Sequence, residues 1–173
     1  MNVDFVSIDG FECAGHPGED DVGGLVLLAK AAKTLKIPYL ASGGLANGRS
    51  LVAALALGAC GVNMGTRFMC TLEAPIHENI KKSIVEGDER RTALMFRTLH
   101  NTARVYSNTV SRKVVEIERE KGSKIEFSDV KDLVSGERGR KVYTTGDPNF
   151  GVFLLTNQIN SLSRYGLLDR LWD

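Results

Sequence analysis

Apolar positions over residues 3–72 follow two alternating periods. Residues 3–9 alternate with period two, so that Val6 and Ile8 share one face and Phe5 takes the other, as in a β-strand. The pattern then changes to helical spacing and repeats, which predicts a helix over 22–35, a strand over 39–42, a helix over 49–57 and a strand over 61–64. Strands that alternate with helices form a parallel sheet, so the sequence predicts an α/β fold.

After residue 72 the pattern is less regular and mostly helical. The predicted elements are a helix over 75–85, a strand or helix over 92–98, a helix over 110–120, a short helix over 127–134, a polar loop over 136–146 and a buried final helix over 150–162. The chain is therefore divided into βα units over residues 1–72 and a helical and loop extension over residues 73–173, which is expected to pack on them.

Composition excludes several classes of protein. The 173 residues carry a net charge of +1, which gives no field that attracts nucleic acid or an anionic membrane. No segment approaches the ~20 apolar residues that cross a bilayer, and the first residues lack a signal-peptide pattern. The cysteines are odd in number and form no C-x-x-C pair, which argues against a disulfide framework or a zinc site (Cys13, Cys60 and Cys70). A cytoplasmic protein is expected.

Each of the three predicted strands ends in small residues. The first is followed by the glycine-rich segment 10–18, the second by Gly43-Gly44 and the third by Gly65-Thr66. The carboxyl ends of parallel strands share one face, so these motifs should converge. Bare N–H groups and a hydroxyl suit a phosphate, although each motif taken singly fits a tight turn better.

The pair of motifs at successive strand ends favours the phosphate interpretation. In (β/α)8 barrels a phosphate site commonly follows strands seven and eight. The sequence therefore predicts a partial TIM (β/α)8 barrel that contains strands six to eight, with segment 10–18 at the end of strand six and a helical segment at the C-terminal end. Arg67 either pairs with the phosphate or makes a surface salt bridge.

His16 is the candidate chemical group of segment 10–18. A neutral imidazole accepts a proton near neutral pH, and its cation holds an anion. The alternative is an exposed histidine in a turn. Glu12 either orients the ring or is structural, and the structural role is favoured; Cys13 is expected to be a small packed residue.

Other polar residues are assigned structural roles. His77 and His100 are expected at the surface, and the three histidines lie too far apart for a metal-binding pattern. The acidic run 19–21 fits the first turn of a helix, where acids interact favourably with the helix dipole, and a divalent metal site is the second interpretation.

Three segments resemble the nitronate monooxygenase family, formerly called 2-nitropropane dioxygenases. They are GFECAGHPG at 10–18, ASGGL at 41–45 and ALALGACGVNMGTRF at 54–68. The resemblance is specific over residues 3–72 and continues more loosely to residue 148. It implies a TIM barrel that uses FMN and O2 to oxidise small alkyl nitronates to a carbonyl compound and nitrite.

The resemblance also implies roles for particular residues. His16 would be the catalytic histidine. The residues that would contact FMN, chiefly at its phosphate, are Ala14, Gly43, Gly44, Asn63, Met64, Gly65 and Thr66. Three departures stand out: Asp9 replaces a frequent glutamine near the flavin, Ala14 replaces a glycine, and residues 151–158 match the family poorly.

Length is the largest departure from the family. Five βα units, on the order of 150 residues at usual barrel sizes, would precede residue 1. Three strands cannot close a barrel, so their flanking strands would be open edges. We therefore expect the C-terminal half of such an enzyme, as an incomplete gene model, a split product or a short isoform. The missing N-terminal half in trans, or a second copy in a homodimer, is the expected partner.

Two alternatives remain open at this point. Another FMN barrel, such as an enoyl reductase or an enzyme like inosine monophosphate dehydrogenase, uses similar glycine motifs, and Cys13 lies near the position of the latter's nucleophile. His16 in its small-residue setting matches the nitronate enzymes better. A non-catalytic half-barrel could instead act as a phosphate-binding or interaction module that dimerises through its open edges.

Overall fold

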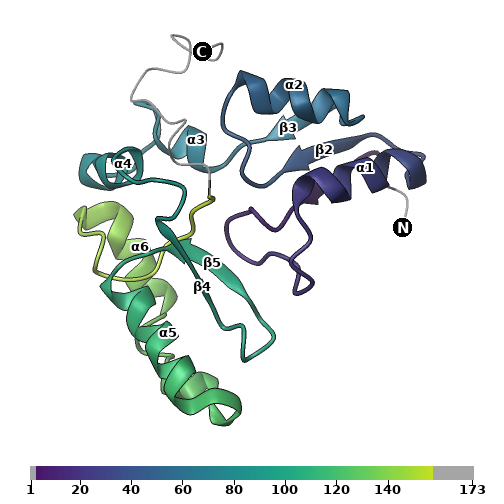
Figure 1. Cartoon of the computed structure of the whole chain (residues 1–173). Helices are drawn as coiled ribbons and strands as arrows, with labels where there is room; N and C mark the ends of the chain where they lie inside the picture. Colours follow the sequence, from purple (N-terminus) through teal and green to yellow (C-terminus); the bar gives the residue numbers. More distant parts are fainter. Residues whose placement is uncertain (1–2, 158–173) are drawn as a thin grey trace.

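The computed structural model describes residues 3–157. The first part of the chain alternates strands and helices: β1 (Val6–Asp9), α1 (Gly24–Thr34), β2 (Tyr39–Ser42), α2 (Gly48–Ala56) and β3 (Gly61–Asn63). The strands are parallel in the order β1-β2-β3, with Asp9 beside Ser42 and Ser42 beside Asn63 (Figure 1). The predicted α/β fold is confirmed, and the carboxyl ends of the three strands lie in line.

Both helices pack on one face of this sheet. Tyr39 and Ala41 lie on the same side of β2 and are buried with Leu28 of α1 and Ala54 of α2. The Tyr39 hydroxyl donates a hydrogen bond to the Leu57 carbonyl at 2.8 Å, so the phenol is buried without losing its polar partner. Alanine-rich sequences in both helices allow this close approach.

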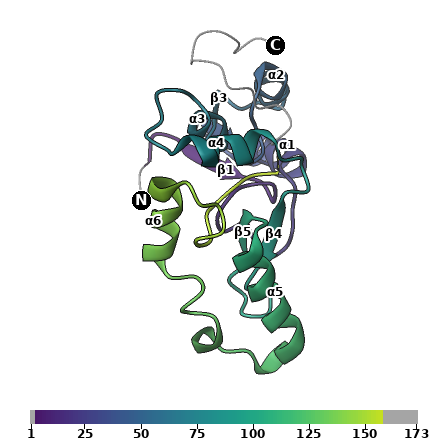
Figure 2. The same ribbon diagram turned by 90° about the vertical axis from the view of Figure 1, so that its left-hand side faces the viewer.

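The remaining elements form a second group. They are α3 (Thr66–Met69), α4 (Glu78–Val85), β4 (Thr92–Met95), β5 (Ala103–Tyr106), α5 (Thr109–Lys121), the 3-10 helices η1 (Gly122–Lys124) and η2 (Phe127–Asp129), and α6 (Gly136–Thr145). β4 and β5 form an antiparallel hairpin, so the ambiguous segment 92–98 begins as a strand. Figures 1 and 2 show α5 beside this hairpin, and α6 near the end of the hairpin that lies opposite its turn.

Two further cores stabilise this group. One lies between the hairpin and α5 and includes Met95, Val105 and Val114. The other joins α4, α6 and the end of β5, and it also takes in Ala46 and Cys70 from the first part of the chain. The division of the chain at residue 72 stays a prediction, and this second core contains side chains from both sides of it.

The segment predicted as a polar loop over 136–146 is helix α6. The Ser135 hydroxyl accepts a hydrogen bond from the N–H of Arg138 at the N-terminal end. The helix stops at Gly146, whose φ of 76° is a left-handed C-terminal cap. The loop prediction was wrong because the glycines of this segment do not outweigh the caps at Ser135 and Gly146 and the burial of Val142 between them.

The final helix predicted over 150–162 is wrong for its described part. Residues 150–157, here called the C-terminal strap, contain no helix; Leu154 pairs with Val105 of β5, and Phe153 accepts a hydrogen bond from Tyr106 N–H. Phe153 and Leu155 are buried while Leu154 is half exposed, which is the period of a strand. Residues 158–162 lie outside the described residues.

Over 127–134 the structure has only the short 3-10 helix η2 and turns, instead of the predicted short helix.

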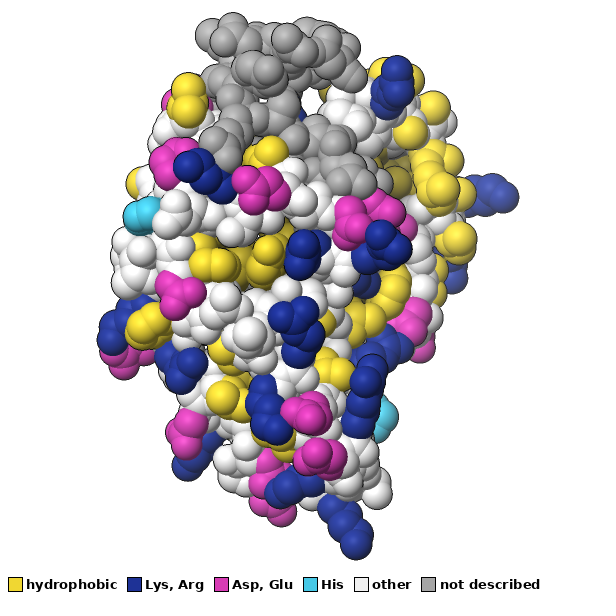
Figure 3. Space-filling view, turned by 60° about the vertical axis from the view of Figure 1, so that its left-hand side comes forward, with side chains coloured by type: hydrophobic (Ala, Val, Ile, Leu, Met, Phe, Trp, Pro, Cys, Tyr) yellow, Lys and Arg dark blue, Asp and Glu magenta, His cyan; other side chains and the backbone are white. Residues whose placement is uncertain are grey.

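None of the helices within residues 3–157 is long and apolar enough to cross a membrane. On the face shown in Figure 3, basic and acidic side chains are interspersed and no large patch has a single sign. This distribution agrees with the net charge of +1.

Replacing Asn108 should destabilise the fold. Its side chain accepts a hydrogen bond from Ser111 N–H at 2.8 Å and donates to the carbonyls of Pro148 and Gly151, and the residue is buried. Asn108→Ala removes the helix cap and leaves both carbonyls unpaired, so we expect a loss of about 2 kcal/mol in urea unfolding. The exposed Asn79→Ala should change stability far less; equal effects would contradict this role.

Candidate functional site

A cavity of about 380 Å³ opens at the carboxyl ends of the three parallel strands. Six of the residues named from the sequence line it: Ala14, Gly43, Gly44, Asn63, Gly65 and Thr66. Asp9, at the end of β1, also lines it. Met64 and His16 are not among its lining residues, although each is two positions or fewer from one that is.

Gly43 brings the loop after β2 against the loop after β1. Its φ is 89°, which a residue with a side chain rarely adopts. A Cβ atom there would lie 3.0 Å from Cys13 Cβ and 3.1 Å from the Gly10 carbonyl oxygen. A glycine at this position therefore allows two strand-end loops to share one cavity.

The cavity wall carries backbone N–H groups that could bind an anion. Within residues 3–157, the N–H groups of Gly44, Leu45 and Gly65 donate no hydrogen bond to a backbone or side-chain acceptor, and all three residues line the cavity. A Cβ at Gly65 would meet nothing within 4 Å, so the space beside this residue is open. Unpaired N–H groups beside open space are the donors that a phosphate needs.

The second part of the chain closes the cavity, which sequence reasoning missed. Tyr143 of α6 and Leu154 and Thr156 of the C-terminal strap line it. Thr156 N–H donates to Thr66 Oγ1 at 3.3 Å, and burial raises the pKa of the Tyr143 phenol. The capping signals of α6 could have indicated a helix here, but nothing local in the sequence places it at the strand ends.

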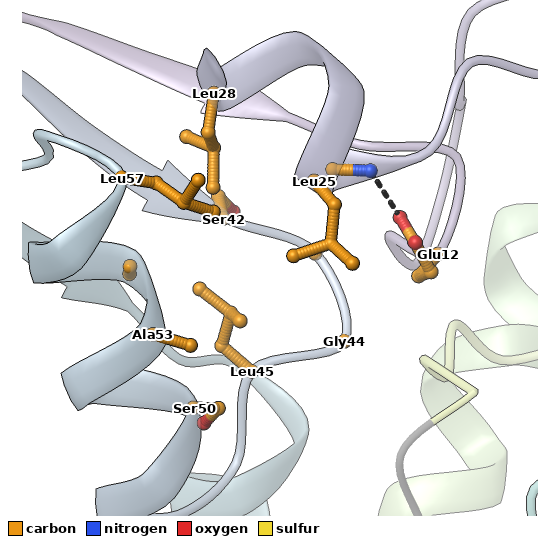
Figure 4. A pocket seen from close by; sticks show the side chains of 12 residues that line it. Glu12, Leu25, Leu28, Ser42, Gly44, Leu45, Ser50, Ala53 and Leu57 are labelled. Carbon is orange, nitrogen blue, oxygen red and sulfur yellow. Dashed lines mark hydrogen bonds between the residues drawn. The ribbon is translucent and has the colours of Figure 1, made fainter. Parts of the chain in front are cut away.

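A second cavity of about 240 Å³ lies between α1 and α2 (Figure 4). Leu25, Leu28, Leu45 and Leu57 point into it. At its edge the Glu12 carboxylate accepts a hydrogen bond at 2.9 Å from the N–H of the first residue of α1, which explains the structural role favoured for this acid.

His16 lies on a loop that the β4–β5 hairpin holds. We call residues 10–21 the His16 loop. His16 Nδ1 is 3.0 Å from the carbonyl oxygen of Thr102, 86 positions away in the sequence. One residue earlier, Gly15 forms an antiparallel bridge with Arg104 of β5. The imidazole is exposed, so a substrate can reach it.

The acidic run 19–21 lies before α1, which begins at Gly24, and so is not its first turn as predicted. Glu19 accepts hydrogen bonds from Thr102 instead, and Asp21 forms an ion pair with Arg97. The Thr102 hydroxyl and N–H lower the pKa of Glu19, and the Arg97 guanidinium lowers that of Asp21. These acids tie the His16 loop to the hairpin, and no group suited to a metal ion occurs among the described residues.

Arg104 is a buried cation between three segments. Its guanidinium donates to the Phe11 carbonyl at 3.0 Å, to Thr92 Oγ1 at 3.1 Å and to Asn157 Oδ1 at 2.7 Å, and it lies over the Phe11 ring. Burial lowers its pKa, and its Nε atom has no hydrogen-bond partner in the described part of the chain. Sequence reasoning did not single this residue out.

The remaining candidates are structural, as predicted. His77 is exposed and caps α4, where its Nδ1 accepts a hydrogen bond from Asn79 N–H at 3.1 Å. His100 is also exposed. Cys13 and Cys70 are buried free thiols, and burial raises the pKa of Cys70 to about 11, which makes it unreactive at neutral pH.

The fold and the cavity define an α/β protein whose candidate site lies at the carboxyl ends of parallel strands. The nitronate monooxygenase family model matches residues 1–165, and the chain belongs to this family of flavin oxidoreductases. A probable nitronate monooxygenase of Bacillus subtilis is 37% identical over 99 residues, which cover 53% of this chain and 28% of that protein.

Two solved structures resemble most of the chain. FabK from Thermotoga maritima matches with a TM-score of 0.85 and 32% identity, over 95% of this chain and 50% of that one. Nitroalkane oxidase from Streptomyces ansochromogenes matches with a TM-score of 0.71 and 27% identity, over 95% of this chain and 48% of that one. The chain therefore spans about half the length of these structures.

The two hydrogen bonds that Glu19 accepts from Thr102 should stabilise the protein only while Glu19 is ionised. A pKa that is lowered on folding contributes stability above the ordinary value of 4.5, and this contribution is lost as the pH falls through the folded value. Glu19→Gln should therefore lower the urea midpoint near neutral pH, and its difference from wild type should shrink below pH 4.5. Asp20→Asn, which removes a neighbouring exposed acid, is the matched control. A difference that stays constant with pH would contradict the prediction.

Proposed function

We propose that this chain forms the phosphate-binding and histidine-bearing part of an FMN-dependent nitronate monooxygenase. The proposed reaction oxidises a small alkyl nitronate, which is added as such or formed in the site when the nitroalkane loses a proton, with O2 to a carbonyl compound and nitrite. The observation that carries the proposal is the convergence of Gly43-Gly44 and Gly65-Thr66, from neighbouring parallel strands, on one cavity with unpaired N–H groups. The family match supports the choice of chemistry.

The residues around the cavity fit the phosphate of FMN. We assign phosphate contacts to the N–H groups of Gly44 and Gly65 and to the Thr66 hydroxyl. Gly43 and Asn63 form the adjoining wall, and Ala14 closes it on the side of the His16 loop. Met64, which follows Asn63 in the sequence and does not line the cavity, is assigned a contact with FMN only through the family resemblance. FMN, when bound, would take up electrons from the nitronate and pass them to O2. Asp9, at the end of β1, lines the same cavity and would face the cofactor.

His16 is assigned the catalytic role at the edge of this site. Its exposed imidazole can accept a proton from an acidic carbon or, when protonated, hold the anion that results. Because the ring is anchored to Thr102 and not to the cavity wall, its replacement should leave the phosphate contacts in place.

The complete enzyme would need further βα units. We propose that β1, β2 and β3 are strands six to eight of a TIM barrel, since the chain spans about half of the solved structures that it resembles. Phe5 beside β1 and Leu25 and Val26 on α1 are more than half exposed, and they would be covered by the preceding units. These units would be supplied in cis or in trans, by an N-terminal half or by a second copy.

Enoyl reduction is the second candidate chemistry within the class, and a non-catalytic phosphate-binding module is the alternative outside it. The FabK structure, which is not named for nitronate or nitroalkane oxidation, has a higher TM-score than the nitroalkane oxidase, so the backbone does not single out nitronate oxidation. Bleaching of bound flavin without oxygen separates the reactions: a nitronate bleaches it in the proposed enzyme, whereas NAD(P)H bleaches it in a reductase. A module without activity would bind flavin and respond to neither.

Binding of FMN should depend on the open space at Gly65. We expect added FMN to show shifted visible absorbance bands with the 173-residue chain, alone or completed with the N-terminal half of a relative. Gly65→Val fills the cavity and should weaken binding about tenfold or more, a cost of about 1.4 kcal/mol. Gly18→Val is the matched control because a Cβ there also meets nothing within 4 Å and Gly18 lies outside the cavity. Equal binding by both variants would refute the phosphate placement, and no binding by either form of the unmutated protein would refute the proposed cofactor site.

Replacing His16 should separate chemistry from cofactor binding. In the completed barrel, His16→Asn should lower the rate of nitroalkane-dependent turnover by about 10²- to 10⁴-fold, because proton transfer loses its acceptor. FMN affinity should not change. His77→Asn, which alters an exposed histidine at the start of α4 and keeps a side chain able to cap that helix, is the control. Unchanged turnover in His16→Asn would rule out its catalytic role.

A further inference from the structure

The hairpin anchors the His16 loop on both sides of the histidine. Before it, Gly15 N–H donates to the Arg104 carbonyl at 3.1 Å, and Arg104 N–H donates to the Gly15 carbonyl at 2.6 Å. After it, the two oxygens of Glu19 accept from Thr102 N–H at 2.7 Å and from Thr102 Oγ1 at 2.6 Å. Thr102 is completely buried, so the residue that contacts the imidazole is itself held in place.

The contact with Thr102 determines where the imidazole carries its proton. A carbonyl oxygen has no hydrogen and only accepts, so the 3.0 Å contact requires a proton on Nδ1 of His16. A neutral imidazole has one N–H, and Nε2 is then the bare nitrogen. Since the ring is exposed, Nε2 is the nitrogen that a substrate would meet.

We propose that Thr102 and Glu19 are positioning residues that hold neutral His16 in the Nδ1–H tautomer, so that Nε2 is the atom that accepts a proton from substrate. The catalytic part rests on the proposed function, whereas the tautomer is a property of this chain alone. In that step a C–H bond of a nitroalkane breaks, its proton forms an N–H bond at Nε2, and the electron pair stays on the substrate as the nitronate. Nδ1 keeps its proton and its bond to Thr102 throughout.

The surroundings of Thr102 support this role. The buried Glu118 of α5 accepts hydrogen bonds from Phe96 N–H at 2.8 Å and Thr98 N–H at 3.4 Å, which fixes the hairpin turn. The ion pair between Arg97 and Asp21 joins the same turn to the end of the His16 loop. Because the Thr102 donors lower the pKa of Glu19, its carboxylate is ionised at neutral pH and accepts both hydrogen bonds.

Nitrogen NMR of the imidazoles measures the tautomer directly in the ¹⁵N-labelled 173-residue chain. Protonated and bare ring nitrogens have well-separated ¹⁵N shifts, and at about pH 8.5, two units above the ordinary imidazole value, the neutral form dominates. The chain has three histidines, and the spectrum of His16→Asn identifies the signals of His16. His77 is an internal reference of the opposite kind, because its Nδ1 accepts a hydrogen bond and its proton is therefore on Nε2.

Three variants test the anchoring residues. Glu19→Ala removes both acceptors, so the His16 signals should move toward those of a free imidazole, with loss of the single Nδ1–H form. Thr102→Ser keeps the hydroxyl, the N–H and the carbonyl and should retain that form. Asp20→Ala removes a neighbouring acid that makes no hydrogen bond within the described residues and should also retain it. Unchanged His77 signals and circular dichroism would show that each variant is folded.

The outcomes separate the two proposals. A wild-type His16 with its proton on Nε2, or a Glu19→Ala variant that is folded and keeps the Nδ1–H form, would overturn the positioning role. Failure of FMN binding or of nitronate oxidation would overturn the proposed function and leave the tautomer result standing, since the NMR measurement uses neither flavin nor substrate.

Discussion

The buried guanidinium of Arg104 is the constraint on which the arrangement of this molecule depends. Only 4% of the residue is exposed, and a buried cation is tolerated only where hydrogen bonds replace its lost water. Its partners are the carbonyl of Phe11 after β1, the hydroxyl of Thr92 in β4 and the side chain of Asn157 in the C-terminal strap. Displacing any one of these segments would remove a hydrogen-bond partner from the buried charge, so Arg104 favours one arrangement of the three.

The candidate site uses this arrangement in two different ways. The glycines that line the cavity lie on the loops after β2 and β3, and Ala14 comes from the loop after β1; the positions of these loops follow from a three-stranded parallel sheet. His16 belongs to one of these loops but takes its orientation from the hairpin, through Thr102. The proposed phosphate contacts therefore depend on local βα geometry, whereas the proton-accepting group depends on packing between the two parts of the chain.

This difference explains what the sequence could and could not reveal. The parallel strands and the convergence of Gly43, Gly44 and Gly65 were predictable, because alternating periods and strand-end glycines are local signals. Helix α6 was missed because its cap at Ser135 was outweighed by its glycines. The contact between His16 and Thr102 spans 86 positions, and no local pattern in a single sequence encodes such a pairing.

The same reasoning explains why His16 is held in place although the parallel sheet has open edges. Strand β1 forms an open edge of the sheet, and Phe5 beside it and apolar side chains on α1 are exposed, so the sheet is not fully covered by the described residues. The hairpin and α5 instead have a buried core of their own. The hairpin binds the His16 loop through backbone pairing with Gly15, hydrogen bonds to Glu19 and the ion pair between Arg97 and Asp21. In the proposed barrel, further βα units would therefore add walls for flavin and substrate around a histidine whose orientation this chain already determines.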